Sequence, residues 1–172
     1  MDVKNIIVLP YDEKWVDDFN KIKAELEERL SGVIVRIEHV GSTSVRGLCA
    51  KPIIDIDVVM KDYSIFDDIV KRLASAGYIY EGNLGIDGRE AFRYDNKPHL
   101  QEHHLYVCPE NSRELLRHTT FRNYLRMHPG AVKKYGEVKL KAAKLYPNDI
   151  KKYLEYKSPV IEEIYRLCGL IQ

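Results

Sequence analysis

The feature that most constrains the fold is a pair of aspartates inside an aliphatic run, residues 53–60, with the sequence IIDIDVVM. Such a run is typical of a central, mostly buried strand. Residues two apart in a strand project from the same face, so Asp55 and Asp57 point the same way. Two carboxylates side by side in a low-dielectric environment are costly unless something neutralises them. The pair therefore predicts either a cleft at the strand end or a positive group beside it.

Paired carboxylate oxygens suit hard divalent cations, so Mg²⁺ or Mn²⁺ is the expected cofactor and both aspartates are the expected ligands. The alternative from the residues alone is a strand with one hydrated face, where the aspartates contact water or a lysine such as Lys51. His104, in a strand expected over residues 103–108, is a further candidate metal ligand if it meets Asp55 or Asp57 across the sheet. A hydrogen-bonded strand histidine is the other interpretation there.

A second motif, Gly41-Ser42-Thr43-Ser44, follows a strand predicted for residues 33–40. Where a strand passes into a helix N-terminus, free N–H groups and hydroxyls can receive phosphate oxygens, and glycine lets the backbone approach the ligand. Most turns of this composition only reverse the chain. Because Asp55 follows Ser42 by thirteen positions, the strand, the Gly-Ser turn and the Asp-x-Asp strand together form the pattern of the nucleotidyltransferase superfamily.

The resemblance is closer at family level. Residues 39–48 (HVGSTSVRGL) and 50–56 (AKPIIDI) make a long first motif, residues 103–107 (HHLYV) a histidine-rich strand, and further matches continue to about residue 157. In these motifs the chain resembles the GrpB family of small bacterial proteins. Two positions depart from the family pattern: Arg46 stands where proline is usual, and Tyr106 where a histidine is common.

This resemblance implies a nucleotidyltransferase-like fold with a helical C-terminal portion. By analogy with that fold, the expected reaction is a metal-dependent transfer from a nucleoside triphosphate to an acceptor that the sequence does not identify. Asp55 and Asp57 would be catalytic. The residues expected to bind the nucleotide phosphates are small or basic: Gly41, Ser42, Thr43, Ser44, Lys51, Arg93, Arg122, Lys139 and Lys157. For basic residues on helices, simple solvation is the competing interpretation.

Active nucleotidyltransferases usually supply a third carboxylate from a later strand, and here the nearest acid to such a strand is Glu102. The alternative function is therefore a non-catalytic nucleotide-binding or regulatory partner protein. Some GrpB-like domains are joined to a kinase of coenzyme A biosynthesis, which suits such a role.

The expected fold class is α+β, a mixed sheet with flanking helices, in a single domain over residues 1–172. A sheet-containing core takes about residues 1–109 and a helical portion about 110–172. Strands are predicted at 5–9, 33–40, 53–60, 78–80, 90–94 and 103–108, and helices at 12–30, 64–76, 112–127, 131–145 and from 148 onward. Ser158-Pro159 marks either a fresh helix start or a kink.

Charge and cysteine usage limit the partners. The 27 basic and 26 acidic residues nearly cancel, so neither nucleic acid nor an anionic membrane is indicated. The three cysteines are widely spaced without a CxxC pair, which argues against disulfide partners and a structural zinc site. With no long apolar stretch and no secretory signal at the first residues, the cytoplasm is the expected location.

Overall fold

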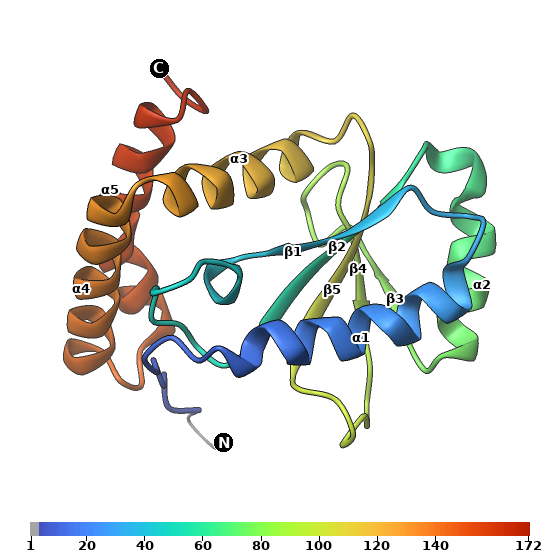
Figure 1. Ribbon diagram of the computed structural model, residues 1–172, viewed down its shortest axis with the longest axis horizontal. Helices are drawn as coiled ribbons and strands as arrows, with labels where there is room; N and C mark the ends of the chain where they lie inside the picture. The colour runs from blue at the N-terminus through green and yellow to red at the C-terminus, as the bar shows by residue number, and fades with distance from the viewer. Residues whose placement is uncertain (1–3) are drawn as a thin grey trace.

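A computed structural model describes residues 4–172 and contains one five-stranded sheet (Figure 1). The strand order is β1-β2-β5-β4-β3. The β2–β5 pair is parallel and the other neighbouring pairs are antiparallel. The strands are β1 (Arg36–Val40), β2 (Ile54–Met60), β3 (Ile79–Gly82), β4 (Glu90–Arg93) and β5 (His103–Pro109). The predicted α+β class with a mixed sheet is confirmed.

Helices α1 (Lys14–Leu30) and α2 (Phe66–Ser75) cover one face of this sheet. Apolar residues recur along α1 at spacings of three and four, so one side of the helix is continuously apolar. Those residues pack against Ile54, Ile56 and Val58 of β2 in the main core, where all three are fully buried. Alternate β2 residues must then face the opposite side, which is the side of both aspartates.

The opposite face is partly covered by α3 (Arg113–Met127). Ser112 caps this helix, because its hydroxyl accepts the N–H of Leu115. Leu115 packs there against Val59 of β2 and Cys108 of β5. Helices α4 (Pro129–Leu145) and α5 (Ile150–Leu167) lie side by side beyond the end of the sheet (Figure 1). The Gly-Ser turn and the Asp-x-Asp strand meet near this helix pair, where the β1–β2 connection also contacts α3.

Several predicted boundaries change. Residues 5–9 form no strand, only an isolated bridge from Leu9 to Ala50. The first sheet strand begins at Arg36 and not at residue 33. Ser64 does not cap α2, whose N-cap is Ile65 without a side-chain hydrogen bond. Asp62 caps the short 3₁₀ turn η2 (Tyr63–Ile65) before that helix, by accepting the N–H of Ser64. Helix α5 is continuous through Pro159, so no new helix starts there.

The predicted helix N-terminus after Gly41 is wrong. Gly41 leads instead into η1 (Ser42–Ser44), one turn of 3₁₀ helix. Residues 45–53 then run as irregular chain, with Gly47 in the left-handed region at φ 84°, until β2 begins at Ile54. In the described residues, no helix is long and apolar enough to span a bilayer.

Candidate functional site

Asp57 lies beneath α3 and has no exposed surface. Its Oδ2 is 2.6 Å from Nδ1 of His118, a residue of α3, and Nε2 of His118 is 3.5 Å from Glu114. Burial raises the pKa of Asp57, and the hydrogen bond from His118 opposes that shift. Burial disfavours the imidazolium, but the Asp57 and Glu114 carboxylates raise the pKa of His118 above its usual range. Both shifts favour a proton shared between Asp57 and His118.

Asp55 is more accessible, with about a third of its side chain exposed (33%). The parallel register places His104 of β5 directly opposite, and its Nδ1 is 3.0 Å from Asp55 Oδ1. That hydrogen bond raises the pKa of His104. His104 therefore meets Asp55 across the sheet as a hydrogen-bonded pair, and its role as a metal ligand stays a prediction.

The Gly-Ser turn lies directly against Asp55. Gly41 has φ 73°, and a Cβ built on it would sit 2.2 Å from Asp55 Oδ2, so only glycine fits there. Asp55 is thus enclosed between the turn on one side and His104 on the other. The expected closeness of the two motifs is found.

Within the turn, the hydroxyls have different partners. Ser44 is buried and donates its hydroxyl to the carbonyl of Gly41. The Arg126 guanidinium donates twice to the carbonyl of Ser44, at 3.0 and 2.8 Å. Thr43 Oγ1 lies 2.9 Å from Nε2 of His39. Ser44 and Thr43 therefore hold the turn in shape, and Ser42 is the hydroxyl that meets a lysine.

Three lysines converge beside the turn on a cavity of about 170 Å³, here called the lysine pocket. Lys51 comes from the segment before β2, Lys139 from α4 and Lys157 from α5. The pocket lining is Ser42, Thr43, Ala50, Lys51, Ile53, Asp55, His104, Lys139, Tyr153 and Lys157. Lys139 Nζ donates to Ser42 Oγ and to the carbonyl of Cys49, each at 2.7 Å. The three predicted lysines, Ser42 and Asp55 are therefore brought together.

The pocket is short of negative charge. Within residues 4–172, Lys51, Lys139 and Lys157 form no ion pair with a carboxylate, whereas several other lysines do. Burial, followed by the charge of Lys157, lowers the pKa of Lys139 to about 7. Burial, followed by the charge of Lys51, lowers the pKa of Lys157 to about 8. Asp55 opposes both shifts but is one carboxylate against three amines.

The structure corrects the expected position of two arginines. Arg93 extends from β4 into a separate hollow and pairs with Asp95 at 2.6 Å. Arg122 is largely buried, and its Nη1 donates to Glu38 at 2.6 Å and to the carbonyl of His39 at 2.9 Å. Neither arginine lines the lysine pocket, and each guanidinium is paired with a carboxylate outside that pocket.

A third carboxylate is not supplied by Glu102, which is half-exposed and pairs with Lys4 at 3.5 Å. Sequence reasoning missed the role of His118, although it lies in a predicted helix four positions after Glu114, a spacing that places both on one helix face. This spacing could have identified the Glu114–His118 pair from the sequence, but it does not indicate that this face of the helix covers Asp57.

The residues fit a divalent cation at one point. Asp57 Oδ1 is buried and has no hydrogen-bond partner among the described residues, which is a costly state for a carboxylate oxygen. Against that, residues 4–172 contain no group of three His, Cys, Asp or Glu side chains arranged to hold a metal by themselves. A cation here would need oxygen ligands from a bound substrate as well, as Mg²⁺ commonly does.

A family model described as GrpB protein matches residues 5–167. The chain belongs to the GrpB family. The glutamate-rich protein GrpB of Alkalihalophilus pseudofirmus is 34% identical over 164 residues, covering 92% of this chain and 93% of that protein. The crystal structure of GrpB from Enterococcus faecalis superposes with a TM-score of 0.82 at 36% identity, covering 94% of this chain and 96% of that one.

Other relatives are longer. YqkA of Bacillus subtilis is 30% identical over 159 residues, and the chain spans 46% of its length. A dephospho-CoA kinase of Mycobacterium tuberculosis is 27% identical over 186 residues, and the chain spans 45% of it. A fainter structural likeness, with a TM-score of 0.49 at 12% identity, is to the Cid1 poly(U) polymerase, covering 77% of this chain and 45% of that one.

Proposed function

We propose that this protein binds a nucleoside triphosphate together with Mg²⁺ or Mn²⁺ and transfers the nucleotidyl group to an acceptor. The phosphates would lie in the lysine pocket and the metal beside Asp55 and Asp57. The observation that carries the proposal is the set of three amines without carboxylate partners, facing Ser42 and Asp55. A polyphosphate supplies the missing negative charge, and a divalent cation offsets its repulsion from the aspartates.

Each residue has a defined part in this proposal. Lys139 and Ser42 would bind the terminal phosphates, where the lysine charge also stabilises a departing pyrophosphate. His104 holds Asp55 in place through its hydrogen bond. Asp55 and Asp57, whose Oδ1 has no hydrogen-bond partner, would hold the cation, and the cation would supply positive charge beside the phosphate oxygens.

A specific observation favours a second candidate, binding without transfer. Asp57 is fully buried and its Oδ2 is bonded to His118, while the β5 residues opposite the two aspartates are His104 and Tyr106, neither of them a carboxylate. A protein of this kind would act through a partner. The similarity to part of a dephospho-CoA kinase supports a partner in coenzyme A biosynthesis.

Calorimetry with each of the four nucleoside triphosphates, with Mg²⁺ or with EDTA, tests the binding proposal. We expect binding to need the metal and to be lost when Asp55→Asn and Asp57→Asn are combined. A double variant of two exposed aspartates elsewhere, Asp87→Asn with Asp95→Asn, serves as the matched control. Unchanged affinity in the first double variant, with a native circular dichroism spectrum, would contradict the metal-site assignment.

Transfer is tested separately with a nucleotide labelled at the α-phosphate and with candidate acceptors that carry hydroxyl groups: small molecules, proteins and RNA. Appearance of label in the acceptor with release of pyrophosphate supports the transferase. Metal-dependent binding without label transfer or pyrophosphate release across this panel would favour the second candidate.

A further inference from the structure

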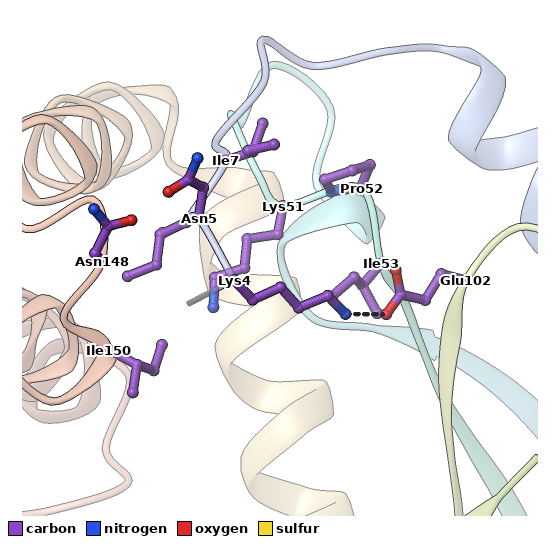
Figure 2. Close-up of a pocket in the computed structure, with 10 residues that line it drawn as sticks. Lys4, Asn5, Ile7, Lys51, Pro52, Ile53, Glu102, Asn148 and Ile150 are labelled. Atoms are coloured by element: carbon purple, nitrogen blue, oxygen red, sulfur yellow. Dashed lines mark ion pairs between the residues drawn. The ribbon is translucent and has the colours of Figure 1, made fainter. Parts of the chain in front are cut away.

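A second hollow, of about 460 Å³, adjoins the lysine pocket and is here called the N-terminal hollow. Figure 2 shows its walls, which come from residues 4–7, from the segment before β2 and from the turn before α5. The lining is mainly apolar, with two amides and one ion pair at its rim: Lys4, Asn5, Ile6, Ile7, Lys51, Pro52, Ile53, Glu102, Asn148 and Ile150.

The two cavities are continuous in their lining. Lys51 and Ile53 belong to both. Ile53 lies two residues before Asp55, so the two cavities lie next to each other along the segment that leads into β2. Lys51 stands at the boundary, where its amine can contact a phosphate while its aliphatic stem borders the apolar wall.

The sizes of the cavities show why the lysine pocket is not a complete nucleotide site. Sites that enclose a whole small-molecule ligand occupy roughly 300–1,000 Å³. At about 170 Å³ the lysine pocket has room for a phosphate chain, but not for a base and a sugar as well. The N-terminal hollow, at about 460 Å³, falls within that range.

We propose that the N-terminal hollow binds the nucleoside part of the nucleotide whose phosphates occupy the lysine pocket, an inference that rests on the function proposed above. The flat faces of a base would pack on Pro52, Ile53 and Ile7. The side-chain amides of Asn5 and Asn148 each offer a donor and an acceptor to the base edge. Within residues 4–172, neither amide is engaged in a side-chain hydrogen bond, so both are available to a ligand.

The experiment separates base from phosphate by comparing two ligands. One is the nucleoside triphosphate that binds most tightly of the four, and the other is inorganic tripolyphosphate, both with Mg²⁺. Asn148→Trp fills the hollow from an exposed turn position. Asn111→Trp, at an exposed turn before α3, is the matched control, and Lys157→Met removes a charge from the lysine pocket.

We expect Asn148→Trp to weaken the nucleotide by about tenfold or more while tripolyphosphate affinity stays the same. Lys157→Met should weaken both ligands, and Asn111→Trp neither. If Asn148→Trp leaves nucleotide affinity unchanged, or weakens both ligands equally, the N-terminal hollow is not a nucleoside site, although the lysine pocket stands. If the native protein binds neither ligand, the proposed function fails and this inference fails with it.

Discussion

Binding of a triphosphate at pH 8 should take up protons from solution, because the lysine pocket keeps two amines partly neutral in the free protein. The pKa of Lys139 is lowered to about 7 and that of Lys157 to about 8. Both shifts arise from burial and from like charge, and a polyphosphate anion opposes both by favouring the ammonium form. Binding therefore raises both pKa values and draws protons onto the amines.

The size of the uptake follows from these pKa values. At pH 8 the amine of Lys139 is mostly neutral and that of Lys157 about half neutral, so complete protonation on binding takes up roughly one to one and a half protons. At pH 6 both amines already carry their protons, and the uptake falls nearly to zero. Affinity should accordingly decrease as the pH rises from 7 to 9, because protonation must then accompany binding.

Titration calorimetry at pH 8 in buffers of different ionisation enthalpy measures this uptake directly. The terminal phosphate of the ligand, with its second pKa near 6, is then fully ionised and contributes little. Lys157→Met should reduce the uptake by at least half a proton, because it removes the share of Lys157 and also the like charge that helps to lower the pKa of Lys139. No uptake at pH 8, or the same uptake in the Lys157→Met variant, would refute the assignment of the anion to these lysines.

Three further outcomes test the structure around the site, each by urea unfolding. Gly41→Ala should destabilise the protein by more than about 2 kcal/mol, since its methyl group would overlap a carboxylate oxygen of Asp55. The control Gly47→Ala, at φ 84° but facing open space, should cost only the backbone strain of about 1 kcal/mol. Equal losses in the two variants would contradict the close packing at Gly41. Arg122→Met should cost about 2 kcal/mol by breaking the ion pair to β1 without weakening tripolyphosphate binding; weaker binding with unchanged stability would return this arginine to the phosphate site. The amine of Lys139 loses its proton near pH 7 in the folded protein but only near pH 10.5 in the unfolded chain. The free energy of unfolding should therefore rise by about 2 kcal/mol between pH 7 and 9, relative to that of the Lys139→Met variant. Parallel pH profiles of the two proteins would contradict the lowered pKa.

The sequence alone was sufficient where a local period decided the geometry. The period of two in β2 placed both aspartates on one face, and the spacing of apolar residues in α1 predicted its buried side. For His104 the sequence left two interpretations open, and the parallel register of β2 and β5 is what places its ring opposite Asp55. Family resemblance pointed to Lys139 and Lys157, which no local pattern distinguishes from solvated lysines.

What failed depended on the packing of distant segments. Arg93 and Arg122 carry charge suited to phosphate, but their own neighbours in space, Asp95 and Glu38, neutralise them first. The turn after Gly41 was expected to open a helix, because its composition is that of a helix start. Residues 45–53 instead run as irregular chain, with Gly47 in the left-handed region and Ala50 bridged to Leu9, a contact that the local composition does not indicate.

The two aspartates have unequal roles, and that difference separates the two candidate functions. Asp55 is open to the lysine pocket, with one oxygen bonded to His104 and the other against Gly41. Asp57 is closed beneath α3, with Oδ2 bonded to His118 and Oδ1 without a partner. In the proposed site, Asp57 would help to hold a cation through Oδ1 while Oδ2 keeps its hydrogen bond to His118. The proposed transfer would therefore depend on the buried Asp57, whereas the proposed binding of phosphates to the lysines would not.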